Sequence, residues 1–546
     1  MITTHPRGPA LLLAAALTTT AISAWARDIT VPGDFTRIQA AIEASKTGDT
    51  ILVTPGTYPE RLTLKPGITL RSVGENTKGR QGLRRAETTI LAHPDGTGPG
   101  VTMAEGSRLD GFTITGVGQY DEVLWTKHHA TQGEQQESRH IGAAGTPGVA
   151  VAHTCEVVHN IVHHIGYTGI AITGAEGREV EPLVAHNTCY RNMGGGIGIM
   201  GGANPILTQN TCYENFHAGI GFSGARGTLK HNHCYRNIRA GIGISENSSP
   251  TLEQNHCHHN RRAGIGIRTG AGTRPKVINN LCTDNDMAGI GAKQKARPLL
   301  IGNTCLRNKL AGIGCKEDAN ATITANTCKD NALAGIGLDG AHATLTKNRC
   351  EGNGTAALGL QDGATATATE NNFIAKTVVA IGVRNGSKLT ATGNQISRKG
   401  GMPPLVAVLE KSTLALTDNQ LEGGGVAALL LQGQATLTGN TLLGNALRKG
   451  GPPNFSAWVK AGSTLEFNGN KVSGWRHAVH AEKPEAITAR QNQITNFHGT
   501  AIVIHNSSTA ATVTGNTAWS SEPNASVVQI IGDKTNVSGN KLLPGN

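Results

Sequence analysis

The chain has 546 residues and a formal net charge of +11, and 72 of its residues are Gly. Hydrophobic residues make up 38% and aromatic residues 3%, too few for a conventional two-layer domain of this length. Charged residues make up only 16%, and Ile, Leu and Val recur regularly, which argues against disorder. The composition therefore predicts an ordered protein with a thin core built from small side chains.

Residues 1–26 have the pattern of a secretory signal peptide. Arg7 precedes an apolar run from Ala10 to Leu17, and the sequence Ala-Trp-Ala at 24–26 precedes a charged residue. The run is too short to span a bilayer, and no later stretch approaches ~20 apolar residues. We expect cleavage near Ala26 and a periplasmic or secreted protein with no transmembrane segment. A buried N-terminal helix is the alternative.

The positive charge has to be interpreted for that compartment. Outside the cytoplasm we expect no nucleic-acid partner, and the anionic candidates are acidic polysaccharides, cell-wall polymers and membrane surfaces. A diffuse basic surface with no specific partner is the alternative. We take a polysaccharide as the expected partner and a monomer as the expected state.

Residues 27–117 are predicted to form a capping helix and the first coils of a solenoid. The segment 28–74 alternates strand, amphipathic helix, strand, turn and strand. Ile38, Ala41, Ile42 and Ala44 share one face of the helix. Such a helix would cover the open edge of the first coil.

Residues 118–150 break the pattern as a His-rich loop insertion. Long loops in repeat proteins are usually functional or disordered, and Trp125 and Tyr120 argue against disorder here. Imidazoles with nearby carboxylates suit Zn or Cu. The candidate metal ligands are His128, His129, His140, His163 and His164. Their spacing matches no defined metal motif, so a sugar-binding or catalytic loop and a structural cover for the early coils remain as alternatives.

Residues 151–372 form regular repeats around an Asn that recurs mostly every 21–25 residues, with intervals of 27 and 30 as outliers. Relative to this Asn, Pro lies at −5, an aliphatic residue at −3, Cys at +2, a second Asn at +5 and Gly-Ile-Gly at +9 to +11. Short alternating apolar runs predict short strands. Because leucine-rich repeats would need several Leu per repeat, the pattern favours an all-β, right-handed parallel β-helix of roughly twenty coils, ~4.8 Å apart. Residues 373–546 are predicted to be C-terminal coils of the same β-helix.

Each repeated residue has an expected architectural role. A column of Asn can link side-chain amides from coil to coil and tolerate left-handed backbone. Cys at +2 suits a narrow interior. We expect free buried thiols, since stacked, parallel Cβ directions give poor disulfide geometry. Disulfides between adjacent coils and soft-metal binding are the alternatives.

Basic residues gather on the middle coils. Cations repeated at the coil step could match the repeated carboxylates of an acidic polysaccharide. Tyr190, Tyr213 and Tyr235 share offset +3 and could stack on sugar rings. The predicted ligand-binding residues are Tyr120, Trp125, Arg236, Arg239, Arg262, Arg268, Lys293 and Lys316. A solvated basic face is the alternative.

The N-terminal run Ile-Gln-Ala-Ala-Ile…Gly-Asp-Thr-Ile…Pro-Gly-Thr-Tyr resembles the start of many exported right-handed β-helix proteins. That superfamily includes pectate-lyase-like enzymes, polysaccharide epimerases and the NosD-type accessory proteins of the nitrous oxide reductase copper site. The resemblance covers nearly the whole mature chain and is specific for fold only. If the chain is an enzyme, the resemblance implies a polysaccharide lyase or epimerase, and the candidate cofactor is a divalent metal (Ca, Zn or Cu).

Three hypotheses therefore stay open. The first is an extracytoplasmic β-helix that binds, and could cleave or epimerise, an acidic polysaccharide. The second is a NosD-like periplasmic accessory protein that handles a metal. The third is a structural surface rod without catalysis. The sequence has no clustered Asp pair and no Asp-Pro-His-Asp run, so it assigns no catalytic residue.

Overall fold

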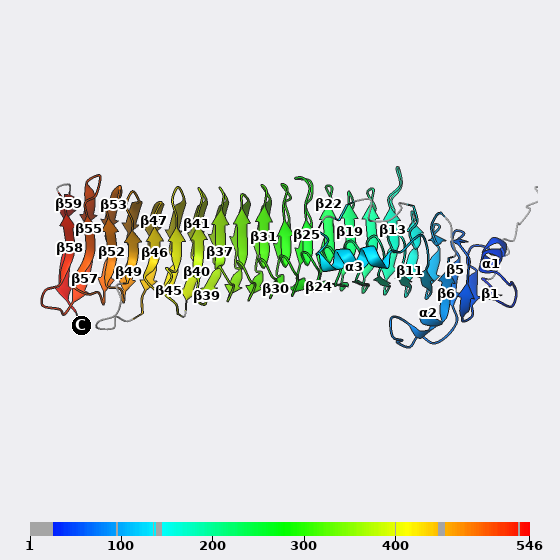
Figure 1. Ribbon diagram of the computed structural model, residues 1–546. Helices are drawn as coiled ribbons and strands as arrows, with labels where there is room; N and C mark the ends of the chain where they lie inside the picture. The colour runs from blue at the N-terminus through cyan, green and yellow to red at the C-terminus, as the bar shows by residue number, and fades with distance from the viewer. Residues whose placement is uncertain are drawn as a thin grey trace, which may run out of the picture.

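The computed structural model describes residues 26–93, 97–134, 136–137, 145–398, 400–445, 454–532 and 535–545. These residues form a long rod of short parallel strands, wound coil upon coil from the α1 end to the C-terminal end (Figure 1). The parallel β-helix predicted from the repeat is therefore confirmed. Within the described part of the chain, no helix has the length and apolarity that crossing a bilayer requires. The predicted signal peptide lies outside the described residues, apart from Ala26.

Three parallel sheets make up the wall of the rod. In the part of the chain that the structure describes, sheet A contains 21 strands, from β1 (Asp28–Val31) to β59 (Thr535–Ser538). Sheet B runs from β3 (Gly56–Tyr58) to β60 (Lys541–Pro544), and sheet C from β4 (Leu62–Thr63) to β58 (Ser526–Ile531). The strands of one regular coil are β20 (Thr228–Lys230), β21 (His233–Tyr235) and β22 (Ile242–Ser245).

The core is the narrow space between the three sheets. Leu229, Cys234 and Ile242, one from each sheet, are all 0% exposed. Strand pairing places Cys212, Cys234 and Cys257 opposite one another in successive coils. All ten Cys are buried and free, which confirms the expected packing role of the thiols.

Two ladders of buried Asn run along the axis. Asn232 Nδ2 donates to Asn255 Oδ1 at 2.9 Å, and the same bond recurs from Asn160 to Asn540. The second ladder follows the Asn at +5, with Asn237 Nδ2 donating to Asn260 Oδ1 at 3.0 Å. The predicted Asn column is confirmed, but its backbone role is different. The left-handed conformation belongs to the residue before each Asn, such as His231 with φ of 55° and Arg236 with φ of 53°.

Three helices stand outside the sheets in the described residues. Helix α1 (Ile38–Ala44) buries Ile38, Ala41 and Ile42 against the first coils, as predicted for a cap, whereas Ala44 is exposed. Helix α2 (Arg84–Thr88) lies near the first coils. Helix α3 (Glu122–Ala130) lies lengthwise along the side of the rod (Figure 1). The predicted loop insertion at 118–150 therefore contains a helix that follows the solenoid axis.

Candidate functional site

Helix α3 is fixed to the rod by an apolar patch on three successive coils. Met193, Phe216 and Ile238 occupy the same offset after the first Asn of their coils, and all three are buried. Trp125 packs on them from the helix. Asp121 begins the helix by accepting a hydrogen bond from the Leu124 N–H at 2.8 Å. The insertion therefore covers the coils through hydrophobic contacts.

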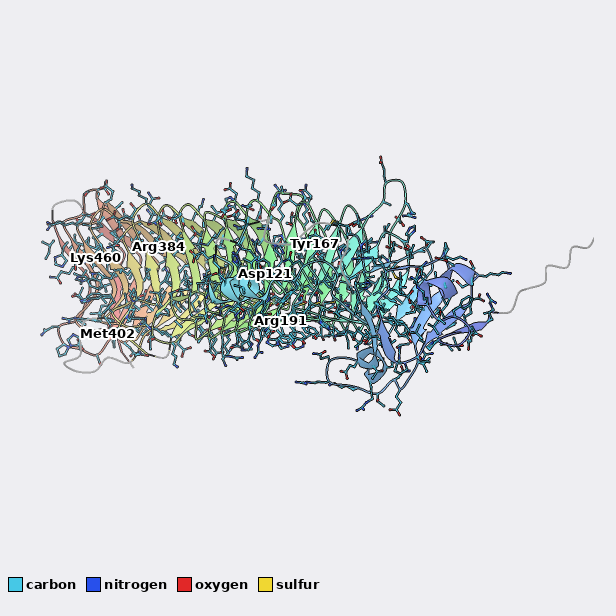
Figure 2. All side chains as sticks on the ribbon, turned by 45° about the vertical axis from the view of Figure 1, so that its right-hand side comes forward. Asp121, Tyr167, Arg191, Arg384, Met402 and Lys460 are labelled. Atoms are coloured by element: carbon cyan, nitrogen blue, oxygen red, sulfur yellow. The ribbon has the colours of Figure 1, made fainter. Side chains whose placement is uncertain are left out.

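Trp125 is the main anchor of α3. Its indole N–H donates to the Glu214 carbonyl oxygen at 2.8 Å, and the side chain is 5% exposed. The Arg191 guanidinium lies 4.1 Å from the ring centroid, and the His129 ring stacks on the indole at 4.8 Å. Figure 2 shows Asp121 of the α3 region and Arg191 near each other on the side of the rod.

A groove of about 600 Å³ lies against α3 and the adjoining turns of the coils. We call it the α3 groove. It contains five basic and three acidic side chains, two imidazoles and one indole. Its lining residues are Trp125, His129, Arg191, Glu214, Arg236, His259, Arg261, Asp284, Asp286, Arg307 and Lys309.

Most charges in the α3 groove are paired. Arg307 Nη2 lies 2.7 Å from Asp284 Oδ2, and the Arg307 hydrogen bond is the main cause that lowers the pKa of Asp284. Arg261 and Lys309 both lie 2.7 Å from the Asp286 carboxylate. The carboxylates of Asp284 and Asp286 are therefore already paired with cations of the groove, and the groove as a whole is positively charged.

Arg191 and Arg236 differ in how firmly they are held. Arg191 bonds to Glu122 of α3 at 2.7 Å and to Glu214 at 3.0 Å. Arg236 is 3.8 Å from Glu214, and its side chain is 62% exposed. Arg236 therefore has the weakest ion pair of the groove arginines and can turn toward a ligand at little cost.

An aromatic ladder lies on the outer face of sheet B. Its members occupy β12 (Ile161–His163), β15 (Thr188–Tyr190), β18 (Thr211–Tyr213), β21 and β24 (His256–His258). Successive ring centroids of His163, Tyr190, Tyr213, Tyr235 and His258 are 4.8–5.0 Å apart, with interplanar angles of 2–19°. Because each ring face covers the next, the rings offer their edges and hydroxyl groups, rather than their faces, to a sugar.

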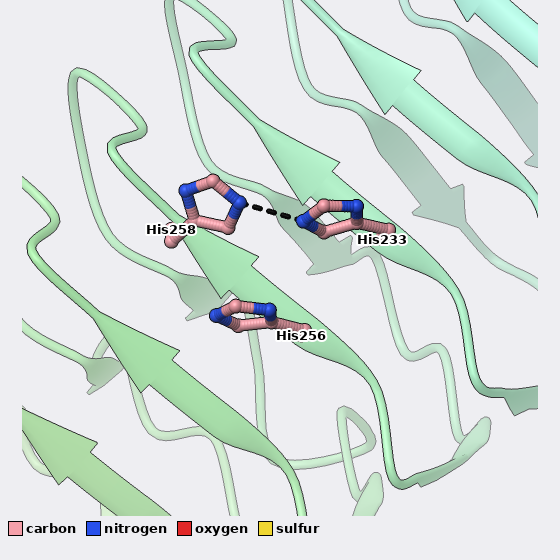
Figure 3. Close-up of side chains that lie close together, drawn as sticks. All are labelled: His233, His256 and His258. Carbon is pink, nitrogen blue, oxygen red and sulfur yellow. Dashed lines mark hydrogen bonds between the residues drawn. The ribbon is translucent and has the colours of Figure 1, made fainter.

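A cluster of three imidazoles adjoins the end of this ladder. The rings of His233, His256 and His258 each direct one nitrogen toward the others, and these atoms all lie within 4.8 Å of one another (Figure 3). The neighbouring His259 lines the α3 groove. The segment Asn-His-Cys-His-His at 255–259 thus connects the imidazole cluster to the groove.

The four predicted metal-ligand histidines that the structure describes do not form one set. His128 is buried with its ring 5.2 Å from Phe216, and His129 stacks on Trp125. His163 Nδ1 and His164 Nδ1 are 2.7 Å apart beside the ladder. His140 lies outside the described residues. Among the residues that the structure describes, the group able to hold an ion is His233, His256 and His258.

Of the predicted ligand-binding residues, Trp125 and Arg236 line the α3 groove. The Tyr120 hydroxyl donates to Glu122 at 2.8 Å, and its ring packs beside α3. Arg239 bonds to the Gln136 side chain and carbonyl, and Arg262 donates to the Gly133 carbonyl oxygen at 2.6 Å. These bonds fasten the segment after α3 to the coils.

Two of the remaining predicted cations, Lys293 and Lys316, lie farther along the rod. Lys316 is 3.1 Å from Asp339 and Lys293 is 3.8 Å from Glu317. Arg268 lies near Arg239 and Arg262. Burial, followed by the charges of Arg262 and Arg268, lowers the pKa of Arg239 to about 10. Arg239, Arg262 and Arg268 therefore concentrate positive charge beside the segment that follows α3.

The imidazole cluster was missed by reasoning from the sequence, although a signal was present. The residues at +1 and +3 after the first Asn of a coil lie on one strand and face the same side. The coil repeat places His233 opposite His256. Reading +1 and +3 together in successive coils would have found the cluster. Our prediction instead followed His density in the insertion, which does not report which side chains converge.

A family model described as a right-handed β-helix region matches residues 137–280, 222–374, 312–472 and 381–542. These overlapping stretches span more than half of the chain. No curated protein matches the chain significantly.

Solved structures of polysaccharide-acting enzymes are among those similar to the chain. The catalytic unit of a thermostable GH87 α-1,3-glucanase from Streptomyces thermodiastaticus is 13% identical, with coverage of 71% of this chain and 70% of that chain and a TM-score of 0.43. The periplasmic alginate epimerase AlgG is 13% identical, with coverages of 72% and 83% and a TM-score of 0.41. The Azotobacter vinelandii mannuronan C-5 epimerase AlgE4 A-module is 14% identical, with coverages of 70% and 90% and a TM-score of 0.34. Similarity at these levels does not identify a substrate.

Proposed function

Because the chain belongs to the right-handed β-helix family, its repeats account for the rod, and function has to be sought where the repeats are modified. We propose that the protein binds an acidic polysaccharide in the α3 groove, with the edge of the aromatic ladder as part of the same surface. The observation that carries this proposal is the groove itself, in which five basic side chains face three carboxylates beside hydroxyl-bearing rings.

The spacing of the groove suits a linear polymer. Arg191, Arg236 and Arg307 share one offset in their coils, so they form a row along the rod axis at multiples of the coil step, ~4.8 Å. A polyuronate presents carboxylates at regular intervals, and guanidinium groups bind carboxylates with paired hydrogen bonds. The chain of the ligand would therefore lie parallel to α3.

The groove favours binding over glycoside hydrolysis. A hydrolase needs one carboxylic acid whose pKa is raised so that it can protonate the leaving oxygen. Here Arg307 lowers the pKa of Asp284, and Asp286 is paired with both Arg261 and Lys309. The Asp284 carboxylate is thus held in the ionised form, and both carboxylate oxygens of Asp286 are already occupied by ion pairs.

A polyuronate lyase or epimerase is the second candidate function. Such chemistry needs a base beside a cation that neutralises the substrate carboxylate. His259 supplies an exposed imidazole in the same groove as Arg236 and Arg307. Incubation with a polyuronate, followed by ultraviolet detection of unsaturated ends and by NMR of the C5 configuration, separates a lyase and an epimerase from a binding protein.

Binding can be tested by calorimetry with a uronic acid hexasaccharide and its carboxyl-reduced, neutral counterpart. We expect binding of the acidic oligomer alone, weakening with added salt because the contacts are ionic. Arg236→Ala should weaken binding by about tenfold, since it removes a charge-assisted hydrogen bond. Arg384→Ala, a control on the residue that follows β40 (Val379–Val383), should leave affinity unchanged. Equal affinity for the neutral oligomer, or an unaffected Arg236 variant, would refute the proposal.

A further inference from the structure

Three imidazoles converge on the outer face of sheet B across two adjacent coils. His233 lies on β21, and His256 and His258 lie on β24 (Figure 3). The strands pair in parallel with His233 opposite His256 and Tyr235 opposite His258. The period of two along a strand brings His256 and His258 to the same face, so the backbone itself positions all three rings.

The rings are close and held on several sides. His233 Nε2 and His258 Nε2 are 2.6 Å apart. The His233 ring stacks on His256 at 5.1 Å with an interplanar angle of 12°, and the His258 ring stacks on Tyr235 at 5.0 Å. In the next coil Leu281 and Thr283 occupy the positions of His256 and His258, so the cluster is confined to two coils.

The surroundings disfavour protonation of the three imidazoles. Burial, followed by the proximity of His256 and His233, lowers the pKa of His258 to about 4. Burial also lowers the pKa of His233 and of His256, whereas the nearby Asp284 acts on His256 in the opposite direction. A neutral imidazole keeps a lone pair on one ring nitrogen, which is the form that coordinates a metal.

An outer layer of contacts orients the rings. His258 Nδ1 and His259 Nδ1 are 2.8 Å apart, so the Nε2 of His258 is the atom left to face the cluster. Metal-binding histidines commonly bond through their second ring nitrogen in this way. His233, His256 and His258 are all half-buried, so an ion among them would remain accessible from outside the rod.

We propose that His233, His256 and His258 form a binding site for one late first-row divalent metal ion, with Zn²⁺ or Cu²⁺ as the ligand class. Three imidazole nitrogens are the donors that these ions prefer, and they leave a coordination position for water or another ligand. Ca²⁺ takes oxygen ligands, so it is excluded at this site. A tetrahedral ion with bonds of about 2.0–2.1 Å needs its ligand atoms roughly 3.4 Å apart, which small rotations of the three rings provide.

The site goes beyond polysaccharide binding and can be tested without it. Zn²⁺ is titrated by calorimetry into the full chain, produced without a histidine tag, near neutral pH. We expect one ion per chain. His256→Asn and His258→Asn should each weaken binding by about 100-fold or more, and His259→Asn, which removes an outer contact, by about tenfold. The matched control is His342→Asn on β35 (His342–Thr346), which should bind as the parent does.

A second measurement guards against indirect effects. Cu²⁺ bound to the parent should give an electron paramagnetic resonance spectrum with nitrogen hyperfine splitting from the imidazoles, and circular dichroism should show that the variants keep the β-helix. Zinc that stays bound in both the His256 and His258 variants would belong to other histidines and would overturn the site. A parent chain that binds no Zn²⁺ at micromolar concentration would overturn it too.

Discussion

At the scale of single residues, the buried Asn ladders explain how short strands make a stable coil. The Asn232 N–H and Nδ2 both donate to Asn255 Oδ1, and Nδ2 also donates to the Leu207 carbonyl oxygen. Asn232 Oδ1 accepts in turn from Asn210. His231, just before it, has φ of 55°, a conformation that costs a non-Gly residue about 1–2 kcal/mol. The ladder offsets that cost at every bend.

Asn232→Ala should therefore destabilise the rod more than its size suggests. The change removes the side-chain oxygen that accepts from the Asn210 N–H and Nδ2. It also removes the side-chain donor to Asn255 Oδ1 and to the Leu207 carbonyl oxygen, all at buried positions. We expect a decrease of about 2–4 kcal/mol in the free energy of unfolding, measured by denaturant titration. Asn320→Ala, at an exposed position of β32 (Asn320–Thr324), should change it by less than about 0.5 kcal/mol. Equal effects of the two substitutions would mean that the ladder contributes little.

Residues that repeat in every coil could be predicted from the sequence, and residues that occur once could not. Asn and Cys recur at fixed offsets, so a period of about 23 residues was enough to place them inside the rod. His256 and His258 form a candidate metal site only together with His233, which lies one coil earlier. Their convergence depends on side-chain direction across two strands, which the abundance of His in the insertion concealed.

At the scale of elements, α3 is the feature that distinguishes these coils from the others. Met193, Phe216 and Ile238 lie under the helix, whereas the next three coils carry Arg261, Asp286 and Lys309 at the same offset. This change from apolar to charged residues marks where α3 ends and where the groove opens. It was visible in the sequence, and it indicated a covering helix more directly than the histidines indicated a metal loop.

Trp125→Ala should release α3 while the solenoid stays folded. An isolated helix of nine residues is marginal in water, so α3 depends on its packing, and loss of a buried Trp costs about 3–5 kcal/mol. We expect faster hydrogen exchange within residues 122–130 and about tenfold weaker binding of the acidic hexasaccharide, because one wall of the groove is lost. Val123→Ala, on a residue that is 81% exposed, is the control. Unchanged exchange in the helix of the Trp125 variant would contradict the anchoring role.

At the scale of the whole molecule, the two ends of the rod differ in the acidic side chains that they bury. In a solenoid each coil contacts only its neighbours, so stability can vary along the axis. Among the described residues, the buried carboxylates are Asp49, Glu60 and Asp110, all in the first coils. The interior of the middle and later coils is filled mainly by apolar side chains, Cys thiols and Asn amides, which do not gain a charge in acid. Acid should therefore weaken the N-terminal coils first.

Asp110 gives the strongest reason to expect that acid weakens the N-terminal coils first. It bonds to the buried Arg85 and lies 3.1 Å from both Arg108 and His159. Burial alone would raise the pKa of Asp110, but hydrogen bonds from His159 and Arg85 outweigh it, so the folded pKa lies well below the usual value of 3.8. The stability that Asp110 contributes is therefore full above pH 3.8, and it is lost as the pH falls from there toward the folded pKa.

Hydrogen exchange at a series of acidic pH values, corrected for intrinsic rates, should show protection lost around Asp110 before it is lost in coils 190–350. Asp110→Asn should destabilise the first coils already at neutral pH, by roughly 3–5 kcal/mol, because Arg85 is 2% exposed and would be left as an uncompensated buried charge. Asp339→Asn removes a carboxylate from the exposed pair with Lys316 and should cost less than about 1 kcal/mol. Acid that weakens all coils together, or an Asp110 variant as stable as the Asp339 variant, would show that the buried carboxylates do not set the order of unfolding. Because the α3 groove and the imidazole cluster lie several coils away from Asp110, we expect both to keep their structure after the capped end has begun to open.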